Sequence, residues 1–120
     1  MKRVERLNKP RQYAAVYAGG GTWASRLIVM RAVRNNLNLS RYGLSVSKKV
    51  GNAVIRNRIK RRLREIMRGE PLDTGWDVVL IARPAAAETS FSALRESVET
   101  LLLRAEILET EKEERPAPER

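Results

Sequence analysis

The stretch from Lys48 to Arg68, KKVGNAVIRNRIKRRLREIMR, constrains the fold of this chain more than any other. From Ile55 onward its apolar side chains recur at helical spacing, at i, i+4, i+8, i+11 and i+12. Such a stripe predicts a helix that packs one side on a core and turns its remaining circumference outward. Asn52 is the expected N-cap of this helix, and Gly69 is expected to end it in a left-handed conformation.

The outward side of this predicted helix is strongly basic. The stretch holds nine of the 24 basic residues and a single acid, Glu65, so it carries most of the formal net charge of +10. Arg56, Lys60 and Arg64 form a ladder of like charges one turn apart, which repel each other. Solvated faces that only keep a helix soluble usually mix charges of both signs. The ladder therefore favours binding to a polyanion, with nucleic acid as the first candidate.

The longer run LSVSKKVGNAVIRNRIKRRLRE, residues 44–65, resembles the signature of the bacterial ribonuclease P protein component. It joins a strand end, a Gly-Asn turn and a helix, with Arg56-Asn57-Arg58 at the centre of the run. The resemblance extends more loosely over about residues 4–108. It implies that the basic helix and the turn before it contact the catalytic RNA subunit. The side chains that would make this contact are Lys48, Lys49, Asn52, Arg56, Arg58, Lys60, Arg61, Arg62 and Arg64.

The rest of the chain alternates between helical and extended patterns. The strand nearest the C-terminus is almost continuously apolar, as expected for a strand buried on both faces. Residues 1–9 are basic and are expected to be mobile. The expected elements are a helix from about Lys9 to Ala18, strands at 27–34, 42–48 and 76–82, and a helix capped by Thr89 or Ser90 that continues to Leu108.

These elements predict an α/β (α+β) two-layer sandwich, with three helices against a small mixed sheet of about four strands. The resemblance implies the order α-β-β-β-α-β-α, with a short extra strand within residues 20–34. It also implies a left-handed βαβ crossover between strands 42–48 and 76–82, against the general right-handed rule. We assign residues 1–108 to a single RNA-binding domain. The acidic, low-complexity residues 109–120 are expected to be a disordered tail.

The amino-acid composition excludes several kinds of catalytic and metal-binding site. The chain has neither histidine nor cysteine, which excludes imidazole catalysis, disulfides and conventional zinc sites. Residues 1–68 contain only two acids, Glu5 and Glu65, whereas a metal nuclease needs several carboxylates beside its basic surface. We therefore expect no catalytic residue and no metal site in the polypeptide. No apolar run approaches the ~20 residues of a membrane span, so we expect a cytoplasmic protein without membrane contact.

The resemblance further implies a cleft between the first helix and the sheet, which binds the single-stranded 5′ leader of precursor tRNA. Matching the family's aromatic positions places Tyr13 and Tyr17 in this cleft, with Arg11 and Ser45 as neighbours. The adjoining strand often carries an aromatic residue, but here it carries Arg31, whose guanidinium plane can replace a ring. Two tyrosines one turn apart are equally consistent with ordinary core packing, and that alternative stays open.

The implied activity is hydrolysis of one phosphodiester, which releases the leader and leaves the mature tRNA 5′ end. The RNA subunit would hold the active site and its magnesium ions. The partners would be ribonuclease P RNA and precursor tRNA, with no obligate protein partner. One alternative is a ribosomal or ribosome-associated RNA-binding protein, which would prefer ribosomal RNA. A second alternative, a stand-alone metal nuclease, is disfavoured by the small number of carboxylates.

Overall fold

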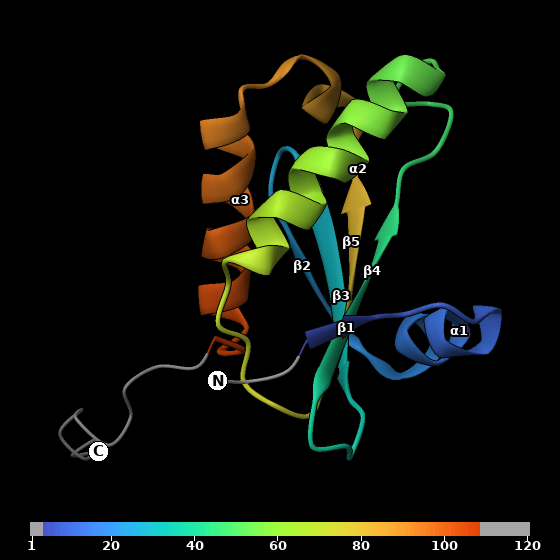
Figure 1. Cartoon of the computed structure of the whole chain (residues 1–120), viewed down its shortest axis with the longest axis vertical. Helices are drawn as coiled ribbons and strands as arrows, with labels where there is room; N and C mark the ends of the chain where they lie inside the picture. Colours follow the sequence, from blue (N-terminus) through green and yellow to red (C-terminus); the bar gives the residue numbers. More distant parts are fainter. Residues whose placement is uncertain (1–3, 109–120) are drawn as a thin grey trace, which may run out of the picture.

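The computed structural model describes residues 4–108, which form a mixed five-stranded sheet flanked by helices (Figure 1). The strands lie in the order β1-β4-β5-β3-β2. The elements along the chain are β1 (Val4–Arg6), α1 (Pro10–Gly19), β2 (Gly21–Ala24), β3 (Ile28–Arg34), β4 (Ser40–Ser45), α2 (Ala53–Arg68), β5 (Trp76–Ala82), the short 3₁₀ helix η1 (Pro84–Glu88) and α3 (Phe91–Arg104).

The centre of the sheet is β5, which is parallel to β4 and antiparallel to β3. Because side chains alternate along a strand, its residues serve both faces. Val78 and Leu80 belong to the large core beneath α2 and α3, whereas Val79 belongs to a smaller cluster beneath α1. The continuous apolar pattern of this strand is thus explained by burial on both faces, as predicted.

The helices are anchored very unequally. The small cluster under α1 consists of Leu7, Val16 and Val79, with Tyr13 packed against it among others. The only fully buried side chain of α1 is Val16. The large core instead receives a full stripe from each of α2 and α3, comprising Ile59, Leu63, Ile66 and Met67 from α2 and Leu94, Val98, Leu101 and Leu102 from α3.

Local chemistry explains where α2 begins and ends. Asn52 caps it as predicted, its side-chain oxygen accepting a hydrogen bond from the Ile55 N–H at 3.0 Å. The left-handed conformation predicted for Gly69 is wrong, because its φ is −94°. The helix ends in tightened turns instead, in which the Gly69 and Glu70 N–H groups bond to the Ile66 and Met67 carbonyls at 3.1 and 3.2 Å.

The predicted class, three helices and a small mixed sheet, is confirmed. The implied left-handed crossover is visible in Figure 1, where β4 and β5 both point upward, α2 passes in front of the sheet, and β5 lies to the left of β4. The structure adds that α1 lies on the sheet face opposite α2 and α3, so the domain has a third layer at one end.

Two details of the sheet differ from the prediction. It has five strands rather than about four, because residues 4–6, expected to be mobile, form β1 beside β4. The segment Val4–Arg6 has only three residues, two of them charged, so it shows no hydrophobic periodicity. It forms a strand through its backbone pairing with β4. The strand expected to reach residue 48 ends at Ser45, since the Val50 N–H closes a turn onto the Ser47 carbonyl at 3.0 Å. The short strand implied within 20–34 is β2. The tail predicted at 109–120 lies outside the described residues.

Candidate nucleic-acid interface

Packing of its apolar stripe fixes the direction of every basic side chain on α2. With Ile59, Leu63 and Met67 buried beneath the helix, the basic residues divide into two flanks and an outer side. Arg58 and Arg62 lie on the flank that faces η1. The ladder of Arg56, Lys60 and Arg64 lies on the flank nearer β4 and β1, while Arg61 is exposed on the outside.

Arg58 and Arg62 are not free, although the sequence predicted that all basic residues off the stripe would point outward. The Arg58 Nη2 donates to the Ala87 carbonyl, and the Arg62 Nη1 donates to the Thr89 carbonyl, each at 3.0 Å. Both side chains are half-buried. They tie α2 to the segment that leads into α3. Because a guanidinium has five N–H donors, each retains donors for another acceptor while serving this structural role.

The outer side and the other flank are better suited to bind an external partner. Within residues 4–108, no hydrogen bond or ion pair engages the side chains of Lys60, Arg61 or Arg64. The Arg56 Nε donates to the Gly51 carbonyl at 3.1 Å, which leaves its terminal nitrogens available. Lys60 and Arg64, two of the three residues of the basic ladder, therefore have no side-chain partner within residues 4–108.

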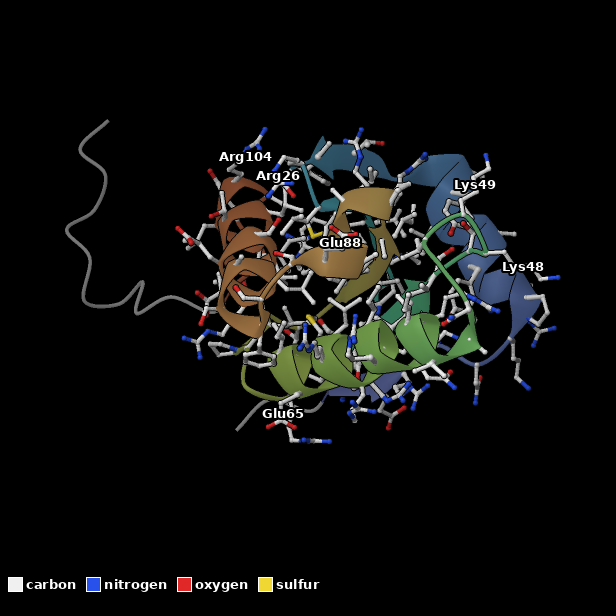
Figure 2. All side chains as sticks on the ribbon, turned by 90° about the horizontal axis from the view of Figure 1, so that it is seen from above. Arg26, Lys48, Lys49, Glu65, Glu88 and Arg104 are labelled. Carbon is white, nitrogen blue, oxygen red and sulfur yellow. The ribbon has the colours of Figure 1, made fainter. Side chains whose placement is uncertain are left out.

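The turn before α2 extends this basic surface. Lys48 and Lys49 are exposed, and Figure 2 shows both projecting outward from the loop between β4 and α2. The side-chain oxygen of Asn52 is occupied as the helix cap, so only its amide nitrogen remains for a ligand. At the far end of the helix, Arg68 pairs with Glu65 at 2.6 Å, both largely exposed, and such surface pairs contribute little to stability.

A second candidate surface lies on the opposite face of the sheet, beside α1. The strand register places Ser45 beside Ile81 and Ile81 beside Val29, which forms one row across this face. The next row pairs Gly43 with Val79 and Val79 with Arg31. Two predicted leader-binding residues of the sheet, Ser45 and Arg31, therefore share the face on which α1 packs.

Tyr13 lies directly over β4, in space that a glycine provides. A Cβ atom built at Gly43 would lie only 2.5 Å from the Tyr13 hydroxyl oxygen. Tyr13 is half-buried and packs against the small cluster, whereas Tyr17 remains 39% exposed. The two alternatives left open for the tyrosines thus divide between them, since Tyr13 serves partly as core and Tyr17 keeps 39% of its surface exposed to solvent.

Arg31 and Tyr17 form a composite surface at the end of α1. The Arg31 Nη2 donates to the Tyr17 carbonyl at 2.5 Å, and its Cζ lies 5.8 Å from the centroid of the Tyr17 ring. This is within the range of a cation–π contact. The guanidinium is therefore positioned beside the exposed ring. Arg11, also predicted here, is exposed in the first turn of α1.

An ion pair between the buried Asp77 and the half-buried Arg41, at one end of this face, gave no signal in the sequence. Asp77 is 4% exposed and accepts two hydrogen bonds from Arg41, at 2.9 and 2.7 Å, and one from the Asn35 amide at 2.8 Å. The Asp77 hydrogen bond raises the pKa of Arg41. Because the partners lie far apart in the chain, only the register of β4 against β5 brings them together.

Neither a metal-binding cluster nor a membrane span is found in the described part of the chain. Across residues 4–108, no three acidic, histidine or cysteine side chains gather closely enough to hold an ion. No helix there is both long and apolar enough to cross a bilayer.

Comparison with known proteins decides the family. A model of the ribonuclease P family matches residues 1–106. The chain belongs to this family. The ribonuclease P protein component of Dehalococcoides mccartyi is 50% identical over 108 residues, which cover 90% of each chain. A Staphylococcus aureus ribonuclease P protein, solved as a mutant with defective mRNA degradation activity, superposes with a TM-score of 0.79 at 34% identity, covering 86% of this chain and 89% of that one. The Thermotoga maritima ribonuclease P protein superposes with a TM-score of 0.76 at 30% identity, covering 82% of this chain and 96% of that one.

The predicted resemblance is therefore confirmed over nearly the whole described domain. The chain is a protein component of ribonuclease P, an RNA-binding subunit of that ribonucleoprotein enzyme in tRNA processing. Membership implies association with ribonuclease P RNA. These relatives do not support the ribosomal alternative.

Proposed function

We propose that the basic side of α2 binds ribonuclease P RNA, while the surface between α1 and the sheet binds the 5′ leader of precursor tRNA. The observation that carries the first part is the set of Lys60, Arg61 and Arg64, which repel one another and lack an internal partner within residues 4–108. Phosphates would relieve that repulsion and release counterions. Lys48 and Lys49 would extend the contact beyond the helix.

The leader surface combines features suited to an unpaired strand. The Tyr17 ring is exposed and has a guanidinium beside it, and unpaired bases stack on both kinds of plane. Ser45 is small and half-buried, so a backbone can approach the sheet closely at that end of β4. Stacking depends little on the identity of the base, which suits a protein that must accept many leaders.

In this function the polypeptide contributes binding rather than bond cleavage. One phosphodiester is hydrolysed, and the RNA subunit supplies the groups that act on it. We propose that the RNA also holds the magnesium ions, since no three potential ligands gather within residues 4–108 and the surface facing the RNA is cationic. The basic side chains would neutralise phosphates and so lower the magnesium concentration that the RNA requires. The proposed place of action is the cytoplasm.

A cleavage assay tests the proposal. Purified protein, its cognate ribonuclease P RNA and a leader-bearing precursor tRNA are combined at low magnesium, with parallel reactions lacking either component. We expect cleavage at the 5′ junction only when protein and RNA are both present. Because one Staphylococcus aureus structure concerns mRNA degradation, the RNA-free reactions include a messenger RNA fragment. Correct cleavage of precursor tRNA by the protein alone would refute the proposed division of roles.

Leader binding is tested by comparing precursor with mature tRNA. Tyr17→Leu removes the exposed ring, and losing one stacked base costs ~1–3 kcal/mol, so the affinity ratio of precursor to mature tRNA should shrink about tenfold. The melting temperature should change little. Tyr13→Leu should lower both quantities, because its ring also packs on the small cluster. An unchanged ratio in both variants would remove the tyrosines from the leader surface.

A further inference from the structure

A cavity of about 520 Å³ lies between the edge of the sheet and the C-terminal end of α2. Its volume is within the ~300–1,000 Å³ typical of small-ligand sites. One wall is β1, the base is β4, and the rest is the last turn of α2 with the loop that follows. The lining residues are Val4, Arg6, Tyr42, Arg64, Met67, Arg68, Gly69, Glu70, Pro71 and Leu72.

The lining is apolar inside and basic at its rim. Tyr42, Met67 and Leu72 are each at least nine-tenths buried, and they present ring, thioether and alkyl surface. Arg6 and Arg64 approach the cavity from opposite sides, one from the sheet edge and one from the helix. Apolar walls with two guanidinium groups at the opening match a flat ring that carries a phosphate.

Glu70 adds a polar group to the inner wall. It is 8% exposed, and burial together with the neighbouring Glu99 raises the pKa of its carboxyl to about 7. Near neutral pH a large fraction of this carboxyl is therefore protonated, with its hydrogen bond directed to Glu99. Its negative charge is correspondingly weak, so it opposes an anionic ligand less than an ordinary glutamate would.

The location favours RNA over a free metabolite. Arg64 is the last member of the ladder that begins at Arg56 and Lys60, so a strand following that ladder arrives at the cavity. We propose that the cavity receives one unpaired nucleotide of ribonuclease P RNA, its base between Tyr42 and the end of α2 and its phosphate at Arg6 and Arg64. This inference rests on the proposed function of α2 and extends it to a site formed jointly with β1.

Arg6→Ala tests the charged rim without altering α2. Arg6 is exposed on an edge strand, so its loss should leave the fold intact. The matched control is Arg26→Ala, also exposed, which Figure 2 shows on the side of the molecule opposite Glu65. In filter binding to the cognate RNA, Arg6→Ala should weaken affinity about five- to tenfold. It should also lower the slope of log K against log salt by about 0.7–0.9. The control should change neither.

Site-specific crosslinking tests the base. The chain contains no cysteine, so one introduced thiol can carry an arylazide. Gly69→Cys places it on the cavity wall, where a Cβ atom meets nothing closer than the Ile66 carbonyl at 3.8 Å. Arg26→Cys is the control. We expect Gly69→Cys to crosslink one or two adjacent unpaired nucleotides of the RNA, and the control to crosslink none of these.

The outcomes separate this inference from the proposed function. If Arg61→Ala weakens RNA binding while Arg6→Ala does not, and Gly69→Cys gives no discrete crosslink, α2 binds RNA and the cavity proposal is wrong. If the wild-type protein does not bind the RNA at all, both fail. A third test titrates the protein with AMP and follows binding by NMR. Saturation at micromolar AMP without RNA would assign the cavity to a free nucleotide and overturn the RNA assignment.

Discussion

Replacing Glu70 with glutamine should remove most of the pH dependence of folding stability between pH 5 and 8. The Glu70 pKa is raised from 4.5 to about 7, first by burial and then by a hydrogen bond to Glu99 and that residue's charge, while Arg95 opposes the effect. The folded protein therefore keeps a proton that the unfolded chain has already released. The free energy of unfolding must fall as pH rises through this window, and it levels off above about pH 7.

The size of this fall in the free energy of unfolding follows from how far the pKa of Glu70 is raised. At about 1.4 kcal/mol per pH unit, a pKa of about 7 in place of 4.5 corresponds to at most about 3 kcal/mol. Glu70→Gln should raise stability by less than about 1 kcal/mol near pH 5 and by up to about 3 kcal/mol at pH 8. The chain has no histidine, so no other side-chain type ordinarily titrates between these values.

Urea denaturation at pH 5, 6, 7 and 8 measures the effect. The matched control is Glu96→Gln on the exposed side of α3, which should keep the wild-type dependence on pH. The reasoning is refuted if the wild-type stability is level across this range, or if Glu70→Gln retains the same slope as the control.

Four further variants have outcomes that follow from the structure. Gly43→Ala should push the Tyr13 ring off β4, because the new Cβ would lie 2.5 Å from its hydroxyl. Stability should fall by about 1 kcal/mol, and the precursor-to-mature affinity ratio should shrink. Asp77→Ala should lower the free energy of unfolding by about 1–3 kcal/mol in urea denaturation, since it removes the acceptor for the half-buried Arg41 guanidinium and the Asn35 amide. Arg61→Ala should flatten the salt dependence of RNA binding at constant melting temperature. Arg62→Ala should also lower stability by about 1 kcal/mol, through the lost bond to the Thr89 carbonyl that follows η1, and equal melting temperatures for these two variants would contradict that role.

The elements predicted well from the sequence are those whose pattern repeats over several turns or residues. The stripe from Ile55 to Met67 and the apolar run of β5 each report burial directly, so both elements were placed correctly. β1 was missed because backbone pairing with β4 leaves no pattern in three residues. The prediction of a left-handed conformation at Gly69 was wrong for a similar reason. The helix ends in tightened turns because of the path that the following loop takes, and the sequence of the helix does not show that path.

The candidate site was predictable in its residue types and less so in its contacts. The charge ladder identified α2 as the basic surface. The sequence could not show that Arg58 and Arg62 reach the carbonyls of Ala87 and Thr89, because a 3₁₀ turn of alanines gives no signal of its own. Likewise, the sequence suggested that the Arg31 guanidinium could replace an aromatic ring, but its contact with Tyr17 depends on how α1 ends.

The placement of α1 and α2 on opposite faces of one sheet has a thermodynamic consequence. A ligand on the α2 side and a ligand on the α1 side meet no common side chain, because β3, β5 and β4 stand between them. Perturbations that share no partner usually add within a few tenths of a kcal/mol. A double variant such as Arg61→Ala with Tyr17→Leu should therefore lose the sum of the two single losses in holoenzyme affinity for precursor tRNA. Binding at one of the two proposed surfaces is therefore expected to leave the affinity of the other surface unchanged.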